Sequence, residues 1–193
     1  MYSLKYFYYL LFIFFFLSCG EAEQEVTETT KTSAEKGISY SDSTRQSIAQ
    51  ILQAYYSLKD ALVAADSVKS AADALTVGAS IDALNLTSVK QADTALYAEV
   101  SALPAIIKIA ALNLSKTNGL EAQREIFETI SDSLYELIKN LKPSGIQAYQ
   151  QYCPMAFNDK GASWLSDTTH IQNPYFGKKM LTCGEVSKEL RYQ

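Results

Sequence analysis

The sequence predicts a mainly α-helical fold: an up-down four-helix bundle over residues 41–142, followed by a small cap of loops and short strands over residues 143–193. Four segments place apolar residues three and four positions apart, which is the spacing of one helix face. The links between these segments are short, which favours antiparallel neighbours. From Pro143 onward the composition changes, since this stretch holds three of the four prolines, four of the eight glycines, the only Trp and the only His.

The N-terminal residues have the pattern of an export signal. Residues 2–17 are almost continuously apolar, with Lys5 near their start, and no stop-transfer charges follow them. They lead into Ser18-Cys19-Gly20, which resembles the lipobox of bacterial lipoproteins, where cleavage leaves a cysteine whose sulfur carries a diacylglycerol. We therefore expect residues 1–18 to be a signal peptide and Cys19 to anchor the protein to the outer membrane of the cell envelope, on its periplasmic or outer face. An uncleaved anchor or a soluble secreted protein is the alternative.

Residues 19–40 are rich in Glu, Thr, Ser and Lys and have little to bury, so they predict a flexible tether. The formal net charge of the chain is −4, and its Lys and Arg residues form no stripe. The electrostatic pattern of a nucleic-acid-binding protein is therefore missing, and we expect no nucleic-acid partner.

The first expected helix covers residues 43–65, and the second begins behind an N-cap at Asp66 or Ser67. Gly78 weakens the prediction that the second helix continues to Leu84. The apolar face of the first helix consists of Ile48, Ile51, Leu52, Tyr55, Leu58 and Leu62. Nothing in this part of the chain indicates chemistry, and its aromatic and alanine-rich faces predict core packing.

The third expected helix covers residues 89–114 and contains Pro104, which predicts a kink or a restart. The fourth follows Asn118-Gly119 and ends before Lys142-Pro143.

Two short strands are expected in the cap, over residues 145–152 and 161–165, with a turn at 173–177. Trp164 is expected to anchor the cap in its own small core. His170 lies in a polar stretch and is expected on the surface.

Four sulfur-bearing side chains of the cap form the candidate site: Cys153, Met155, Met180 and Cys183. Thiolate and thioether are soft ligands that favour monovalent copper and related ions. In a strand, Met155 projects to the same side as Cys153, and a helical turn places Met180 and Cys183 on one face. Joined together, the two pairs predict a site for Cu(I) or Ag(I). Zinc is less suitable, because structural zinc sites use Cys and His.

A disulfide is the alternative for the same two cysteines, because paired thiols outside the cytoplasm usually oxidise. A bond between Cys153 and Cys183 closes a loop of about 30 residues, which is worth roughly 3–4 kcal/mol of loop-closure entropy. Met155 and Met180 then serve only as packing beside Trp164. The sequence leaves both alternatives open.

Several motifs together resemble a known family. They are residues 152–157 (YCPMAF), 164–166 (WLS), 173–177 (NPYFG), 180–184 (MLTCG) and, upstream, 55–66 (YYSLKDALVAAD). This set resembles the signature of domain of unknown function 3347, over roughly residues 43–186. Members resemble envelope lipoproteins or domains fused to the adaptor subunits of copper and silver efflux pumps. The resemblance therefore implies metal handling and an efflux adaptor as partner.

One departure concerns the metal site. The run Cys153-Pro154-Met155 is similar to a Cys-Pro-Met-His-Pro metal-binding motif, but Ala156 and Phe157 follow it here, so the histidine is absent.

The sequence thus predicts a membrane-anchored extracytoplasmic lipoprotein that binds soft metal ions in connection with heavy-metal efflux. The alternative is a non-metal interaction module with a Cys153–Cys183 disulfide that docks on an envelope adaptor. An enzyme is not expected, because the chain has a single histidine, no nucleophile elbow and no phosphate-binding glycine loop.

Overall fold

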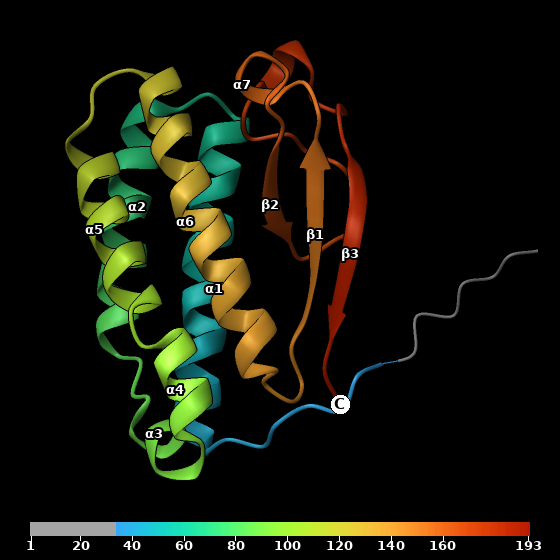
Figure 1. The fold of residues 1–193 in the computed structure, drawn as a ribbon. Helices are drawn as coiled ribbons and strands as arrows, with labels where there is room; N and C mark the ends of the chain where they lie inside the picture. Colours follow the sequence, from blue (N-terminus) through green and yellow to red (C-terminus); the bar gives the residue numbers. More distant parts are fainter. Residues whose placement is uncertain (1–33) are drawn as a thin grey trace, which may run out of the picture. The chain divides into compact units, whose positions relative to one another are not determined.

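Helices occupy the first two thirds of the computed structural model, which describes residues 34–193 (Figure 1). They are α1 (Asp42–Val63), α2 (Ser67–Asp82), α3 (Thr87–Ala92), α4 (Thr94–Val100), α5 (Leu103–Lys116) and α6 (Leu120–Leu141). The C-terminal part contains β1 (Gln147–Cys153), α7 (Ala156–Asp159), β2 (Ala162–Ser166), the 3₁₀ turn η1 (Gly177–Lys179) and β3 (Glu185–Arg191). The predicted fold class is confirmed. The expected signal peptide and the Cys19 anchor lie outside the described residues.

Capping side chains set the starts of the first two helices. Ser41 caps α1, where its hydroxyl accepts a hydrogen bond from the backbone N–H of Thr44 at 3.3 Å. Asp66 caps α2, where its carboxylate accepts from the N–H of Lys69 at 2.9 Å. The predicted N-cap at this position is therefore confirmed. The second helix continues through Gly78 to Asp82.

The third predicted helix is divided into three. Asp93 ends α3 and caps α4, because its carboxylate accepts hydrogen bonds from the N–H groups of Ala95 and Leu96. A second break lies before α5, whose first turn contains Pro104. The restart expected at this proline is confirmed, whereas the earlier break was not predicted. Residues 94–116 are long and apolar enough to cross a membrane, but they form α4 and α5 here, and α5 packs against α2 and α6.

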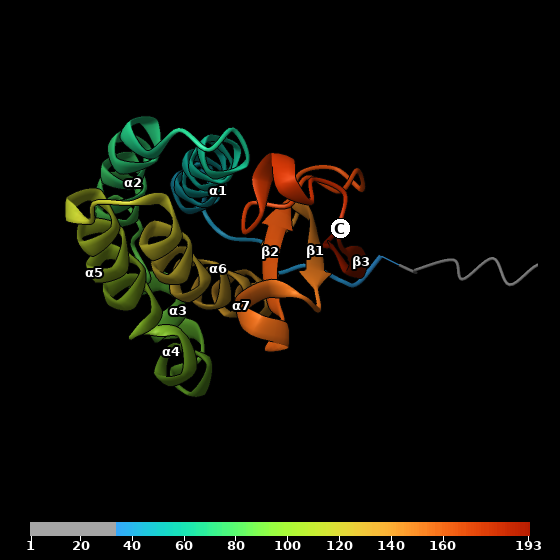
Figure 2. The same ribbon diagram turned by 90° about the horizontal axis from the view of Figure 1, so that it is seen from above.

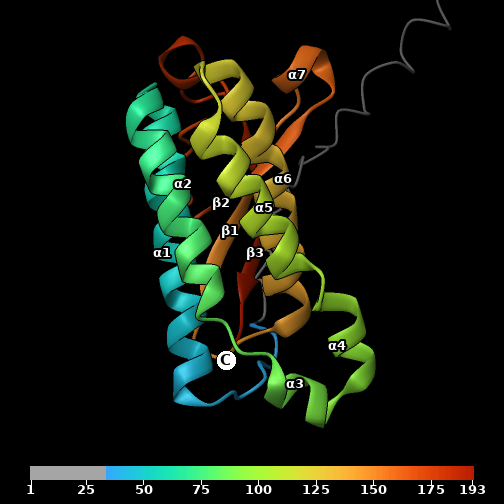
Figure 3. The ribbon, with the colours of Figure 1, turned by 90° about the vertical axis from the view of Figure 1, so that its left-hand side faces the viewer.

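The four long helices form a bundle that packs against the sheet, with α1 and α6 next to the sheet and α2 and α5 on the far side of them (Figure 2). In the side view of Figure 3, α2 and α5 lie in front, on the side of the helices away from the sheet. The most amphipathic helix is α6. Its buried residues include Phe127, Ile130, Leu134, Leu137, Ile138 and Leu141. The helix contacts both α5 and β2, so α6 joins the helical bundle to the sheet.

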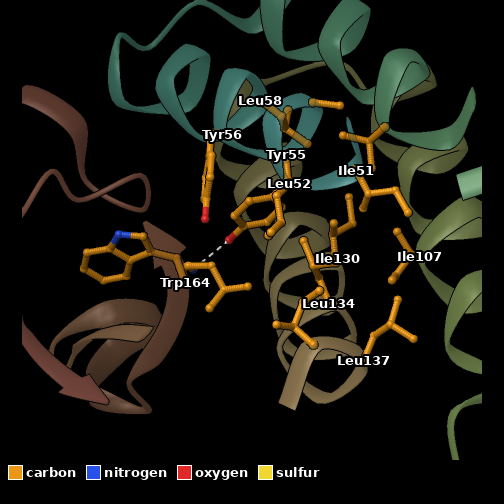
Figure 4. Close-up of a cluster of buried hydrophobic side chains, with 14 of the residues drawn as sticks. Ile51, Leu52, Tyr55, Tyr56, Leu58, Ile107, Ile130, Leu134, Leu137 and Trp164 are labelled. Atoms are coloured by element: carbon orange, nitrogen blue, oxygen red, sulfur yellow. Dashed lines mark hydrogen bonds between the residues drawn. The ribbon is translucent and has the colours of Figure 1, made fainter. Parts of the chain in front are cut away.

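The sheet has the order β2–β1–β3, and both pairs are antiparallel. Its contact with the helices centres on Tyr55 of α1, as Figure 4 shows. The Tyr55 hydroxyl lies 2.7 Å from the Ser131 hydroxyl and accepts a hydrogen bond from the N–H of Leu165 at 3.0 Å. The indole of Trp164, the preceding residue, points away from the helices (Figure 4), because successive side chains of a strand alternate between its faces.

Residues 35–38 are tied to the C-terminal end of the chain and to the residues that follow α6, although the sequence predicts a flexible tether here. The N–H of Glu35 donates to the carbonyl of Arg191 at 3.0 Å, and the N–H of Gly37 donates to the carbonyl of Gln193 at 2.7 Å. The Ile38 N–H donates to the carbonyl of Lys142 at 2.7 Å. The tether prediction is therefore wrong for these residues, because backbone groups pair here without needing apolar side chains.

Candidate functional site

The two internal cysteines meet at one edge of the sheet region. Cys153 is the last residue of β1, and Cys183 lies in the loop before β3. Their Sγ atoms are 2.9 Å apart, and both residues are free thiols. Cys153 is fully buried, whereas Cys183 is partly accessible. The structure therefore joins two thiols that are far apart in the sequence.

Strand pairing and one buried amide hold this contact. Tyr152 pairs with Glu185 of β3, so the residues before Glu185 run alongside the end of β1. The Asn173 side chain is fully buried, and its Nδ2 donates to the carbonyl of Cys183 at 2.7 Å. Its Oδ1 accepts from the N–H groups of Tyr175 and Phe176, at 2.8 and 3.2 Å. Asn173 thus fixes the 173–177 turn and the Cys183 backbone to each other.

Gly184 allows the close approach of this loop to β1. Its φ is +138°, and a Cβ there would lie 2.8 Å from the carbonyl oxygen of Tyr152 and 2.9 Å from Cη2 of Trp164. A side chain is therefore excluded at this position. The same distances place the edge of the Trp164 indole beside the residue that follows Cys183.

The hydrogen bond with Cys153, together with burial, raises the pKa of the Cys183 thiol to about 11. A thiol with this pKa remains protonated at neutral pH. Since metals bind thiolates, an ion that binds here must displace protons.

The two thioethers lie on a different side of the same region. Met155 is 46% exposed and Met180 is partly buried. Both line a surface pocket of about 430 Å³, and neither cysteine does. The other residues that line it are Glu121, Glu125, Phe157, Asn158, Asp159, Tyr175 and Phe176. The four predicted sulfur residues are thus arranged as a thiol pair and a thioether pair.

One wall of the pocket has an unusual backbone. Phe157, Asn158 and Asp159 have φ values of 53°, 56° and 65°, which is the left-handed region. Asn and Asp tolerate this region, whereas Phe loses about 1–2 kcal/mol there. In this conformation the Phe157 ring packs edge-on against Tyr175, with 5.2 Å between the ring centroids.

Arg124 is a buried residue whose role was not predicted from the sequence. Its Nε donates to the carbonyl of Pro174 at 2.8 Å, and its Nη2 donates to the carbonyl of Leu62 at 3.2 Å. Its Nη1 pairs with Glu121 at 2.7 Å. Arg124 therefore links α6 to the end of α1 and to the turn that Asn173 begins. A charged residue on the apolar face of a helix was the available signal, since arginine is rarely buried without partners.

His170 is exposed, and no contact places it beside the sulfur atoms. Trp164 is buried, with 1% of its surface exposed, as expected for an anchor of the cap. Within residues 34–193, no group of three or more His, Cys, Asp and Glu side chains is arranged to hold a metal ion.

The two thiols must separate before both can bind one ion. Two sulfurs that share one ion at about 2.3 Å in tetrahedral geometry lie about 3.7 Å apart. The Sγ atoms at 2.9 Å must therefore separate by somewhat less than 1 Å. Cys183 lies on a partly accessible loop, whereas Cys153 is held in a strand, so this movement falls to Cys183.

Comparison with known families gives one match. Residues 51–145 match the model of a family described as "Protein of unknown function (DUF3347)". The matched segment runs from the middle of α1 to the residues before β1, so the sulfur-bearing motifs of the resemblance lie outside it. No curated protein and no solved structure matches the chain. Residues 51–145 therefore form a domain of the DUF3347 family, the family that the sequence motifs resemble.

Proposed function

We propose that this protein is a lipid-anchored protein of the cell envelope that binds Cu(I) or Ag(I) and serves the efflux or homeostasis of these ions. Cys153 and Cys183 are the principal ligands, and Met155 and Met180 are additional ligands. The observation that carries the proposal is the 2.9 Å contact between the two thiols. Cys19 is the expected membrane anchor.

The donor set determines the class of ion. Two thiols with two thioethers nearby present only soft sulfur atoms, which suit Cu(I) and Ag(I). Calcium and magnesium require clusters of oxygen ligands, and zinc binds thioethers poorly. On binding, each thiol releases a proton to the solvent and the metal keeps its oxidation state, so the affinity rises with pH.

An efflux adaptor is the proposed partner, because the family that the motifs resemble includes domains fused to such adaptors. In this scheme the protein holds or transfers the ion outside the cytoplasm. No catalytic step is part of the proposal.

A second function is favoured by one observation. The Sγ distance is shorter than a shared metal ion requires, and it suits two cysteines that are ready to form a disulfide. In that case the cap is a structural element of a docking module, and the thioethers belong to a surface pocket without a bound ion.

A competition titration tests the metal proposal. Reduced, tag-free protein is titrated with Cu(I) against a chromophoric chelator, with Zn(II) as the control ion. The wild type is expected to remove one equivalent of Cu(I) from the chelator, and the Cys153→Ser/Cys183→Ser variant is expected to lose this ability. Equal binding by the two proteins contradicts the proposal.

The oxidation state of the cysteines separates the two functions. Protein isolated from the envelope is alkylated without prior reduction, and its intact mass is measured. Two alkylated thiols support the metal site, whereas an unmodified pair that reacts only after reduction supports the disulfide module.

A further inference from the structure

The sulfur atoms form a gradient of exposure from the solvent to the core. Met155 is 46% exposed, Met180 and Cys183 are partly buried, and Cys153 is fully buried. Met155 follows Cys153 by two residues, so their Cα atoms are within about 7 Å. The Cys183 N–H donates to the carbonyl of Met180 at 3.1 Å, and this turn brings their Cα atoms within about 7 Å as well. The backbone of each methionine is therefore close to that of one cysteine, but only the methionines line the pocket.

The pocket also carries negative charge. Glu121 is paired with Arg124, whereas Glu125 and Asp159 form no ion pair among residues 34–193. Nearby lysines do not neutralise these two carboxylates: Lys160 is bonded to Glu128, and the lysines of η1 do not line the pocket. The side chains of Phe157, Tyr175 and Phe176 also line the pocket. A cation that approaches this pocket is attracted before it reaches any sulfur atom.

The thioethers and the thiols also differ in whether they must lose a proton before they bind an ion. A thioether is neutral at every pH, so it binds a soft cation without losing a proton. The thiols must release theirs before their sulfur atoms coordinate an ion as thiolates. The first contact with an ion therefore costs least at the thioethers.

We infer that the Met155–Met180 pocket is a separate capture site for Cu(I) or Ag(I), from which the ion passes inward to Cys153 and Cys183. This inference rests on the proposed function. In the transfer, the two metal–thioether bonds break and two metal–thiolate bonds form. Two thiol protons leave to the solvent, and the metal remains monovalent. Glu125 and Asp159 attract the ion to the pocket without being its ligands.

Methionine methyl NMR tests capture directly, with Ag(I) as the probe and full-length protein in detergent. In the Cys153→Ser/Cys183→Ser variant, Ag(I) is expected to shift the labelled methyl signals of Met155 and Met180 together and with fast exchange. The Met155→Leu and Met180→Leu variants assign the two signals. Signals that do not move, or movement of only one of them, would overturn the inference.

A kinetic experiment keeps the inference testable if the double serine variant does not fold. Ag(I) association with reduced protein is followed through Trp164 fluorescence, since this indole lies beside the Cys183–Gly184 backbone. The Glu125→Gln/Asp159→Asn variant is expected to associate about three-fold or more slowly at low salt, and equally fast at high salt. Asp73→Asn/Glu99→Gln, which removes two carboxylates from α2 and α4, is the matched control. Equal rates for all three proteins overturn the inference.

The two proposals fail in different ways. Tight binding of Ag(I) at the thiols, with silent thioethers and unchanged rates, overturns the capture site and leaves the proposed function intact. Thiols that do not bind Ag(I) in the wild type overturn the proposed function and, with it, the inward transfer.

Discussion

The hydroxyl of Tyr55 accepts a hydrogen bond from the backbone N–H of Leu165 at 3.0 Å, and this bond joins the middle of α1 to the edge strand β2. The same hydroxyl lies 2.7 Å from that of Ser131 on α6. One phenol group therefore connects both helices to the sheet. The position of the sheet on the bundle, and with it the position of the thiol pair, depends on this contact.

Replacement of Tyr55 by Phe is expected to destabilise the protein by about 1–3 kcal/mol, because the Leu165 N–H is left buried without its acceptor. Tyr56→Phe is the matched control. The Tyr56 hydroxyl is buried and has no hydrogen-bond partner in the described part of the chain, so its removal is expected to cost little. Urea unfolding of both variants measures the difference. Equal destabilisation would show that the bond to Leu165 does not position the sheet.

Replacement of Asn173 by Leu is expected to destabilise the cap by about 1–3 kcal/mol and to separate the thiols. The variant loses the donor to the Cys183 carbonyl and the acceptor for the 173–177 turn. The rate of disulfide formation with a mild oxidant reports on the thiol contact, and it should fall. Asn113→Leu, at an exposed position on α5, should leave this rate unchanged. An undiminished rate in the Asn173 variant would contradict the positioning role.

Gly184→Ala is expected to lower the stability of the protein, whereas Gly78→Ala is expected to raise it. At position 184 the added methyl meets the Tyr152 carbonyl in a backbone conformation that alanine avoids, so a loss of about 1–3 kcal/mol is expected. At position 78, within α2, the nearest atom is the Ala111 Cβ at 3.9 Å. Alanine there should stabilise the helix by about 0.5–1 kcal/mol. Thermal unfolding distinguishes the two, and a stabilising Gly184→Ala would show that the loop does not approach β1 this closely.

The pKa of the Cys183 thiol, raised to about 11, gives a defined pH dependence. Its alkylation rate by iodoacetamide should still rise between about pH 9 and 11, where the rate of an ordinary thiol has levelled off. In Cys153→Ser the strongest cause of the shift is removed, so the midpoint should move toward that of an ordinary thiol. A midpoint near 8.5 in the wild type would contradict the contact between the thiols.

The raised pKa of Cys183 also makes the stability of the folded protein depend on pH. The thiol binds its proton more tightly in the folded state than in the unfolded chain. Its contribution to stability is therefore complete below about pH 9 and is lost as the pH rises toward 11. Comparison of wild type with Cys183→Ser isolates this contribution from that of the buried tyrosines, whose pKa values are also raised by burial.

The sequence predicted the long helices well because their signals are local. The apolar periodicity of α1 and α6, the N-cap at Asp66 and the stop before Pro143 all act within a few residues. The apolar spacing has a gap at Ala92 and Asp93, but the break there was not predicted, because the capping bonds of Asp93 depend on a backbone conformation that the spacing does not encode. Helix α2 continues through Gly78 because neighbouring helices stabilise it there, and helix propensity alone does not indicate this.

Strand β3 was also missed, for a different reason. Its residues, Glu185–Arg191, are mostly exposed and charged, so they show little apolar alternation. The strand exists because its backbone pairs with β1, and such pairing is non-local. The same explanation applies to residues 35–38, which pair through backbone groups with the end of the chain and with the residues that follow α6.

The sequence indicated the four sulfur-bearing residues of the candidate site. The structure adds that the two thiols are in contact, whereas the two thioethers line a separate pocket. The near-symmetric Cys153-Pro-Met155 and Met180-Leu-Thr-Cys183 runs correctly suggested that both cysteines belong to one place. No pattern in the sequence indicates that Met155 and Met180 line a pocket with Glu125 and Asp159, because those carboxylates come from α6 and from a left-handed turn. The roles of Arg124 and Asn173 were likewise hidden, since their partners are backbone carbonyls of distant segments.

X-ray absorption at the copper edge, on reduced full-length protein with one equivalent of Cu(I), tests most directly whether sulfur holds the ion. A first shell of sulfur atoms alone is expected in the wild type. Cys153→Ser/Cys183→Ser should remove the two short metal–thiolate distances from this shell, whereas Met155→Leu/Met180→Leu should leave these two distances in place. A nitrogen and oxygen shell in the wild type, or a spectrum that the cysteine replacements leave unchanged, would contradict the account.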